Sequence, residues 1–397
     1  MFEKVTPPVE DALEAMFLRL LNDPRPDKLD LGIGIYRNDQ GEIPLMDCVR
    51  QAELRMVEQP VHKGYLTPLG NQDYCQTVLK LTLGDNHPML IDGSIVTAQT
   101  PGAGGALRMA AEVIKEISPA SRAWFSDPVW PHQMDFFAAA GVEIKQFRYY
   151  DITAAQRLDD AAIRDLADMN TGDILVLHGS CHNPTGEDPD LELWQRLTDI
   201  VLKTGAIPLV DVAYQGFGDG IEEDVAGLRL LAQQVPELIL VYSSSKSFGI
   251  YRDRAGLLAF CRRGANKRET ALRHRLRDAV RRNYFMPPDH GAVLITEILS
   301  DDSLYNLWVA ELNQLSTRIK QLRSMFRRAM ESRIPGFDGA FLERQKGMFS
   351  CLPIDADTQA RMEQEFGIYM IPNARLNFAA LAQSQADRVA EVVAELR

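Results

Sequence analysis

Residues 238–249 read Leu238-Ile239-Leu240-Val241-Tyr242-Ser243-Ser244-Ser245-Lys246-Ser247-Phe248-Gly249. The run begins with five consecutive apolar residues, which is typical of a strand covered by helices on both faces. Three serines and a lysine follow at once. Lysine is the side chain that condenses with aldehydes when its neighbours lower its pKa, and the hydroxyls and Arg254 beside it offer phosphate ligands. The ordinary alternative is a surface lysine that happens to follow a strand.

The sequence around this stretch alternates short apolar runs with longer helical patterns, between about residues 95 and 262. Such alternation is typical of a parallel α/β sheet. We expect seven strands, at Ile95–Thr100, Arg122–Ser126, Val142–Tyr149, Asp173–Leu177, Ile207–Asp211, Leu238–Ser243 and Ala255–Cys261. We expect helices at Ala106–Ile117, Leu191–Lys203 and Val225–Gln234, and a long helix without glycine or proline from Asp302 to about Ser332. The C-terminal segment is expected to pack with the first forty residues.

Composition limits the class of protein. The chain has 397 residues, of which 46% are hydrophobic and 25% charged, values that exclude disordered, collagen-like and coiled-coil proteins. Its 43 basic and 55 acidic residues give a net charge of −12, which argues against nucleic acid or anionic lipid as a general partner. The five cysteines form no CxxC pair, so we expect no disulfide framework and no metal site. The N-terminus has no signal-peptide pattern and no run is long enough to span a bilayer, which together predict a cytoplasmic protein.

A glycine-rich turn, Thr100-Pro101-Gly102-Ala103-Gly104-Gly105, follows the first expected strand and opens a helix. Free backbone N–H groups at a helix start make a phosphate site. The turn is a poor dinucleotide fingerprint, because Leu107 stands where the third glycine belongs, and it has no Walker lysine. A glycine turn that only allows tight strand–helix packing is the alternative.

Polar residues also end two other strands. Asp211 ends one of them, where ligands bind in open α/β sheets, although an aspartate there can equally cap a helix. The segment His178-Gly179-Ser180-Cys181-His182-Asn183-Pro184 follows another. Its histidines and cysteine share one short turn, a spacing that disfavours a metal ion. Asn183-Pro184 indicates instead a rigid turn that fixes the direction of one amide.

Together these motifs resemble the aspartate and aromatic amino acid aminotransferases, which are fold type I enzymes that use pyridoxal 5′-phosphate. The resemblance covers essentially the whole chain. It also includes Gly32–Arg37, Gly64–Leu66, Trp130-Pro131, Phe147–Asp151, Ala213–Phe217, Arg281–Tyr284, Pro287-Pro288, Gly347–Ser350 and Arg375. It implies a large domain (43–312) with a mostly parallel seven-stranded sheet, a smaller α+β domain (13–42 and 313–397) and an N-terminal arm (1–12).

The resemblance also implies roles for residues around the cofactor. Lys246 would bind the cofactor aldehyde covalently and then move the substrate proton. Asp211 would keep the pyridine nitrogen protonated, so that the ring can accept electrons. Tyr214 and Asn183 would hydrogen-bond the ring's phenolic oxygen, and Trp130 would stack on the ring. The phosphate would be bound by Ser243, Arg254, the backbone amides of Ala103 and Gly104, and Tyr65 from a partner subunit.

For the substrate, the resemblance implies that Arg375 grips the α-carboxylate, with Gly34, Asn183 and Trp130 nearby. Arg281 would reach across from the partner subunit of a homodimer to the distal carboxylate of aspartate or glutamate. The implied activity is amino transfer between an aromatic or dicarboxylic amino acid (tyrosine, phenylalanine, aspartate) and 2-oxoglutarate. A decarboxylase or β-eliminase with the same cofactor is the main alternative; a nicotinamide-dependent oxidoreductase and a non-catalytic regulator domain are weaker ones.

The sequence departs from the family at five positions. Gly104 replaces a hydroxyl residue, which removes one phosphate hydrogen bond at a cost of about 1 kcal/mol. His132 and Gln133 replace an asparagine and a histidine after Trp130, so the histidine's bond to Asp211 must be remade by Gln133 or lost. Phe285 and Met286 replace a Ser-Asn pair near the distal carboxylate site. Their apolar area favours aromatic substrates, although it is also compatible with another amino acid.

Overall fold

The central sheet has seven strands in the order β2-β10-β9-β8-β7-β3-β4 in the computed structural model, which describes residues 2–5, 11–58, 63–91, 95–264 and 267–396. The strands are β2 (Ile95–Pro101), β3 (Arg122–Asp127), β4 (Glu143–Arg148), β7 (Ile174–His178), β8 (Ile207–Val212), β9 (Glu237–Ser243) and β10 (Ala255–Arg262). Only β10 runs antiparallel to its neighbours. The prediction of a mostly parallel seven-stranded α/β sheet is confirmed, each strand within two residues of its expected bounds.

Alternate side chains of the central strands enter two separate cores. Leu209 and Val241 belong to the core on one face, whereas Val210 and Leu240 belong to the core on the other. Because successive side chains of a strand point to opposite faces, a strand covered on both sides must be apolar throughout. This explains why the expected strands read as continuous apolar runs.

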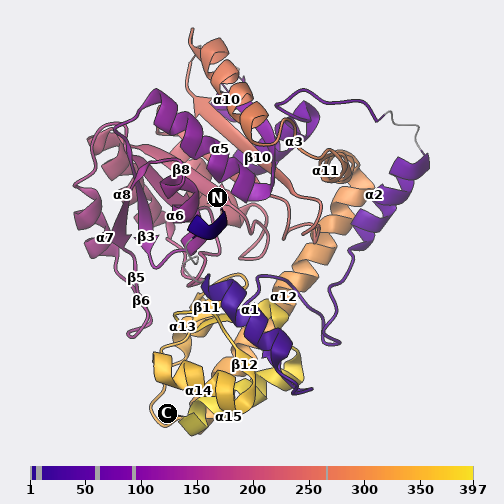
Figure 1. The fold of residues 1–397 in the computed structure, drawn as a ribbon, viewed down its shortest axis with the longest axis vertical. Coiled ribbons are helices and arrows are strands. Elements are labelled where there is room, and N and C mark those ends of the chain that lie inside the picture. Colours follow the sequence, from indigo (N-terminus) through magenta and orange to yellow (C-terminus); the bar gives the residue numbers. More distant parts are fainter. Residues whose placement is uncertain (1, 6–10, 59–62, 92–94, 265–266, 397) are drawn as a thin grey trace.

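Helices cover both faces of the sheet and continue into the lower part of the molecule in Figure 1. They are α1 (Ala12–Asn22), α2 (Asp47–Glu58), α3 (Gln72–Leu83), α4 (Pro88–Ile91), α5 (Gly102–Ile117), α6 (Pro131–Ala138), α7 (Asp159–Leu166), α8 (Leu191–Thr204), α9 (Ala226–Ala232), α10 (Glu269–Asn283), α11 (His290–Ser300), α12 (Asp302–Arg333), α13 (Ala340–Arg344), α14 (Ala356–Phe366) and α15 (Gln383–Leu396). Short 3-10 turns lie at Phe2–Lys4, Glu223–Val225 and Phe378–Ala380. The expected helix at 225–234 is therefore a 3-10 turn followed by the shorter α9.

The long helix α12 connects the sheet-bearing part to the lower part of the molecule (Figure 1). It has 32 residues, and the Asp301 carboxylate caps its start by accepting from the backbone N–H groups of Ser303 and Leu304. No glycine or proline interrupts it, as expected from the sequence.

A segment near the N-terminus and the C-terminal part of the chain pair in that lower part. Strand β1 (Leu29–Asp30) pairs in parallel with β12 (Ile368–Tyr369). Two further small sheets pair β11 (Phe349–Cys351) with β13 (Arg375–Asn377), and β5 (Tyr150–Asp151) with β6 (Gln156–Arg157). The domain boundaries at 12/13, 42/43 and 312/313 stay a prediction, and residues 1 and 6–10 of the predicted arm lie outside the described residues.

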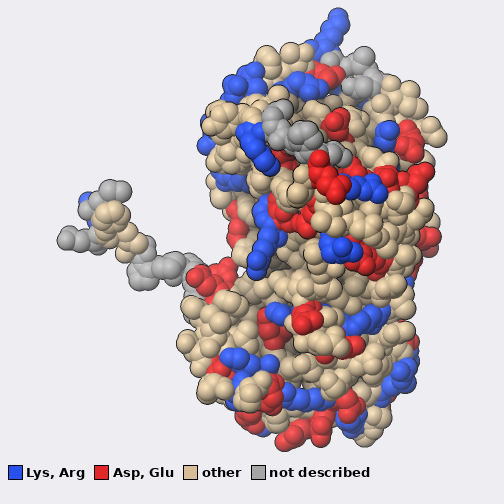
Figure 2. Space-filling model, turned by 90° about the vertical axis from the view of Figure 1, so that its right-hand side faces the viewer, with Lys and Arg blue, Asp and Glu red and all other residues tan. Residues whose placement is uncertain are grey.

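The charged side chains on the face shown in Figure 2 are dispersed, and the cysteines are unpaired. Acidic and basic side chains are mixed over this face, without a large field of one sign. All five cysteines are buried and free. Among the described residues, no group of histidine, cysteine and acidic side chains has the arrangement of a metal site, and no helix is long and apolar enough to cross a bilayer.

A buried arginine ties α12 to the chain that leads into β11. Arg323 is only 2% exposed, and its guanidinium donates to Ser350 Oγ at 2.6 Å and to the Phe349 and Gly347 carbonyls at 2.6 and 2.9 Å. It also lies 4.6 Å from the centre of the Phe378 ring. Burial lowers the pKa of this guanidinium to about 10, so it remains charged at neutral pH.

We predict that Arg323→Leu lowers the free energy of unfolding by about 3 kcal/mol, because it leaves several buried acceptors without a donor. Urea unfolding followed by circular dichroism measures this change. The matched control is Arg328→Leu on the same helix, where the side chain is exposed and the expected change is within about 0.5 kcal/mol. Equal effects of the two substitutions would contradict the stabilising role of Arg323.

Candidate active site

A cavity of about 200 Å³ lies at the carboxyl ends of the sheet strands. The loops after β2, β3, β7, β8 and β9 all contribute to it, as expected for an open α/β sheet. Its walls are Gly34, Ala103, Gly104, Trp130, His178, Asn183, Asp211, Ala213, Tyr214, Ser243, Ser245, Lys246, Tyr251 and Arg254. Ten of the predicted site residues are among them, brought together from sequence positions more than 200 residues apart.

Lys246 and Asp211 are the two charged groups at the centre of the cavity. Burial lowers the pKa of Lys246 to about 8, while the Asp211 carboxylate opposes that shift and Arg254 and Arg375 add to it. Burial also raises the pKa of Asp211 to about 6, against a hydrogen bond from Gln133 and the charge of Lys246. Near neutral pH the lysine therefore has a substantial neutral fraction, the form that acts as nucleophile and base.

The bond that supports Asp211 is present despite the unusual residue at position 133. Gln133 Nε2 donates to Asp211 Oδ2 at 2.6 Å and lies 3.2 Å from His178 Nε2. Of the two outcomes left open by the sequence, a remade bond and a lost bond, the first is the one found. The other carboxylate oxygen, Oδ1, is buried and has no hydrogen-bond partner among the described residues.

The start of α5 forms the anion-binding end of the cavity. Gly102, at φ +69°, opens the helix, and no side chain caps the first N–H groups. Arg254 Nη1 donates to Ser245 Oγ at 3.1 Å, so its guanidinium lies beside the same end. Helix N–H groups, serine hydroxyls and an arginine are the donors that bind phosphate.

Gly104 contributes no side chain to this end, as expected, and an aromatic ring uses the space. A Cβ added at Gly104 would come 3.1 Å from the Phe136 ring, and Phe136 in turn meets Trp130 edge to face at 6.4 Å. The Phe136 ring thus lies between Gly104 and Trp130.

Arg375 is not itself part of the cavity wall but contacts it. Its Nη1 donates to Asn183 Oδ1 at 2.9 Å, its Nη2 donates to the Gly32 carbonyl, and its Nε has no partner among the described residues. The guanidinium lies 4.1 Å from the centre of the Phe349 ring. The buried arginine is thus oriented and still has a donor to offer.

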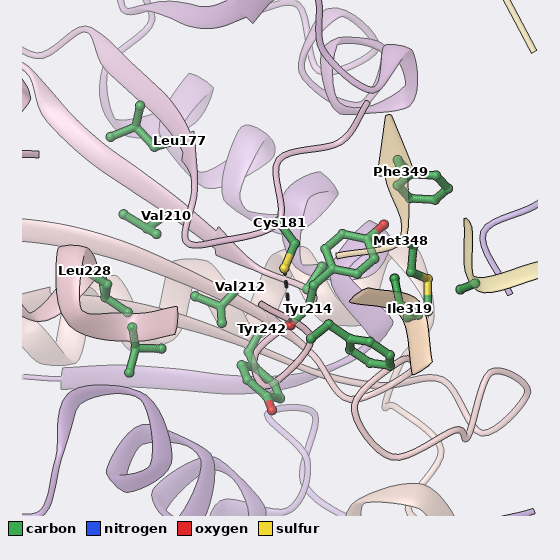
Figure 3. Close-up of a cluster of buried hydrophobic side chains, with 14 of the residues drawn as sticks. Leu177, Cys181, Val210, Val212, Tyr214, Leu228, Tyr242, Ile319, Met348 and Phe349 are labelled. Atoms are coloured by element: carbon green, nitrogen blue, oxygen red, sulfur yellow. Dashed lines mark hydrogen bonds between the residues drawn. The ribbon is translucent and has the colours of Figure 1, made fainter. Parts of the chain in front are cut away.

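Tyr214 lies between these groups. Asn183 Nδ2 is 3.4 Å from the Tyr214 hydroxyl, and the Lys246 ammonium is 5.0 Å from the centre of the tyrosine ring. Figure 3 shows Tyr214 next to Val212 at the end of β8, with Phe349 and Met348 on its other side. The Tyr214 and Phe349 rings meet edge to face at 6.0 Å.

Three predicted site residues do not line the cavity. One of them, Arg375, is buried and bonded to the cavity residue Asn183; the other two are Tyr65 and Arg281. Both side chains are exposed, Tyr65 to 87%. The Tyr65 ring meets that of Phe285 edge to face at 6.2 Å, and Phe285 is itself 56% exposed with a backbone φ of +67°. The single chain thus leaves these aromatic residues without cover.

Four residues of the cavity wall were not predicted as site residues: His178, Ala213, Ser245 and Tyr251. The Tyr251 hydroxyl accepts from the backbone N–H of Tyr36 at 3.0 Å and so links the wall to the N-terminal segment. The other three, Ser245, Ala213 and His178, lie at or just after the carboxyl ends of strands. That position was the sequence feature that could have predicted them as site residues.

Comparison with known proteins agrees with this geometry. Residues 26–393 match the aminotransferase class I and II family. The chain is 38% identical to the aromatic-amino-acid aminotransferase of Pseudomonas aeruginosa, over 100% of this chain and 98% of that protein. It is 36% identical to the aspartate aminotransferase of Salmonella typhi, over 99% of each. The crystal structure of the aromatic-amino-acid aminotransferase from Burkholderia pseudomallei, covalently bound to pyridoxal phosphate, superposes with a TM-score of 0.96 at 34% identity, covering 100% of this chain and 99% of that one.

The residues present fit that cofactor. The unpartnered Asp211 Oδ1 is an acceptor for a protonated ring nitrogen, the anion-binding end suits a phosphate, and Lys246 is the amine that an aldehyde needs. The comparisons favour amino transfer over the decarboxylase and β-eliminase alternatives. The chain belongs to the class I and II aminotransferase family, and its cofactor is pyridoxal 5′-phosphate.

Proposed function

We propose that the protein transfers amino groups between aromatic or dicarboxylic amino acids and 2-oxoglutarate. The observation that carries the proposal is one cavity wall in which Lys246 and Asp211 occur together, with Arg375 buried beside them. The bound cofactor supplies an electron-accepting ring on which the substrate Cα–H bond becomes acidic. The decisive experiment assays a panel of amino donors with 2-oxoglutarate and follows glutamate formation.

In this proposal Lys246 has two tasks, to hold the cofactor and to carry the proton of the substrate Cα atom. Its lowered pKa supports both, because the amine must be neutral to attack an aldehyde or to accept a proton. Asp211 holds the ring nitrogen in its charged form, and Tyr214 with Asn183 would bind the ring's phenolic oxygen. Trp130 would stack on the ring, and Ser243, Arg254 and the amides of Ala103 and Gly104 would bind the phosphate.

Arg375 is proposed to bind the substrate α-carboxylate. A guanidinium forms charge-assisted, two-point bonds with a carboxylate, and the unpartnered Nε is available for one of them. Gly34 is tightly packed against the Phe349 ring beside Arg375, since a Cβ at position 34 would come 3.0 Å from that ring.

The second carboxylate of aspartate or glutamate is proposed to meet Arg281 of a partner subunit in a homodimer, where the partner's Tyr65 completes the phosphate site. The exposure of Tyr65 and Phe285 supports this arrangement, because neighbouring exposed aromatic residues are typical of surfaces that another chain covers. The apolar Phe285 and Met286 near Arg281 support acceptance of aromatic side chains by the same site.

We predict that Lys246→Ala lowers kcat by at least about 10,000-fold, because the group that moves the proton is lost. The cofactor should still bind without a covalent bond, since its phosphate and ring contacts come from other residues. Reduction with borohydride before denaturing gel filtration distinguishes the two forms of attachment, because only an imine to the chain is converted into a stable bond that keeps the chromophore on the protein. Lys203→Ala on the exposed face of α8 is the matched control and should behave as wild type.

We predict that the Lys246 amine of the cofactor-free protein becomes reactive with a midpoint near pH 8, because labelling needs the neutral amine and burial lowers its pKa. Mass spectrometry of the labelled peptide after brief exposure to an amine reagent at each pH measures this midpoint. Since the Asp211 carboxylate raises the lysine pKa, Asp211→Asn should move the midpoint below 8. A midpoint near 10.5, the value for an unperturbed lysine, would contradict the burial argument.

We predict that Arg281→Leu lowers kcat/KM for aspartate about 100-fold and leaves phenylalanine within about threefold, because only the dicarboxylate loses a charge-assisted contact. Steady-state assays with both donors measure the difference. The neighbouring exposed residue gives the matched control, Arg282→Leu, which should affect neither substrate.

Mixed dimers test whether the site is shared. In a hybrid of one Lys246→Ala chain and one Arg281→Leu chain, one site has both native residues only if Arg281 acts across the interface. Aspartate activity should therefore return in the hybrid, to about half of the wild-type value. If Arg281 acts within its own chain, the hybrid stays inactive with aspartate.

A further inference from the structure

Gln133 occupies a buried position between two titratable groups of the cavity. It lies on α6, its side chain is fully buried, and its amide nitrogen contacts both Asp211 Oδ2 and His178 Nε2. The amide nitrogen carries two protons and can only donate. One proton therefore points to the carboxylate and the other to the imidazole.

The orientation of this amide is fixed by electrostatics. Turning it over would place the carbonyl oxygen against the Asp211 carboxylate, where two acceptors would repel each other. In the orientation found, Gln133 Oε1 has no partner among the described residues. Leaving this neutral oxygen without a hydrogen bond costs less free energy than leaving the buried Asp211 carboxylate without one.

The amide in turn decides the protonation of His178. Since His178 Nε2 must accept a hydrogen bond from the Gln133 amide, the ring carries its own proton on Nδ1. Burial lowers the pKa of His178 to about 4, so the ring is neutral at working pH. Its neighbour His182 is held between Ser126 Oγ at 2.9 Å and Thr185 Oγ1 at 2.8 Å, and burial keeps its pKa well below the usual range.

We propose that Gln133 is the positioning residue for Asp211, and that its two donated protons give the carboxylate a pH-independent support by locking His178 in the Nδ1–H tautomer. The proposal rests on the assigned role of Asp211 at the cofactor ring. A histidine at position 133 could itself gain a second ring proton, whereas an amide does not titrate.

The other groups facing Asp211 do not replace this support. Lys246 comes from the turn after β9 and lowers the pKa of Asp211 by its charge, and Tyr214 follows β8 with a pKa that burial raises above its usual value. Across the β7–β8 pair, His178 lies directly opposite Asp211 in register. Of these groups, only Gln133 makes a described hydrogen bond to the carboxylate.

The test uses selective ¹⁵N labelling of the seven histidines in the cofactor-free protein, with His178→Phe to assign one signal. The expected wild-type result is a His178 signal of the Nδ1–H tautomer that stays constant from about pH 5.5 to 9. In Gln133→Met, which keeps the volume and removes both donors, the tautomer ratio should change. No change of that ratio would overturn the proposal, whether or not the protein transfers amino groups.

A second measurement separates support of Asp211 from a purely structural role. The dissociation constant of pyridoxal 5′-phosphate, measured by fluorescence quenching across pH, should show the titration of Asp211 near 6 in wild type and about one unit higher in Gln133→Met. Gln133→His should restore the lower value and add a second titration. An identical profile for Gln133→Met and wild type would also overturn the proposal, and if one variant fails to fold, the other still decides between the outcomes.

Discussion

The burial of a lysine and an aspartate in one cavity, without a described direct bond between them, is the constraint on which the rest of the site depends. Burying either group costs less free energy when the group is neutral. Burial therefore moves the two pKa values toward each other, to about 8 for Lys246 and about 6 for Asp211. The sheet holds the pair in place through its register, since Asp211 pairs with Val241 one strand away and Lys246 follows the end of that strand. A loop-built site would let such charges move toward water.

Much of the fold could be predicted because apolar runs identify strands that are covered on both sides. The seven strands and the long α12 follow from such local patterns, whereas α5 begins at Gly102, before its expected start at Ala106. The bounds of α9 differ from expectation at both ends, because Val225 belongs to the 3-10 turn Glu223–Val225 and the helix ends at Ala232. Local sequence does not separate a 3-10 turn from a first helical turn.

The candidate site was predictable where a polar residue lies at, or shortly after, the carboxyl end of a strand, as with Asp211, Asn183 and Lys246. The contact of Gln133 with His178 and Asp211 joins three segments that are distant in sequence, and no local pattern indicates which of two amide orientations the fold selects. The packing of Phe136 against Gly104 could not be predicted either, because the two residues lie on different helices. Exposed residues such as Tyr65 raise a different difficulty, since the role proposed for Tyr65 depends on a second chain.

The bonds of Arg375 to Asn183 and to the Gly32 carbonyl have a consequence for binding entropy. A free arginine side chain loses about 2 kcal/mol of rotational freedom when it is immobilised. Here the protein has already ordered the guanidinium during folding, so a substrate carboxylate that binds there as proposed would meet a receptor of fixed shape. Under that proposal, selectivity for the amino acid would depend on the rest of its side chain, and donors of very different bulk could share the same anchoring point.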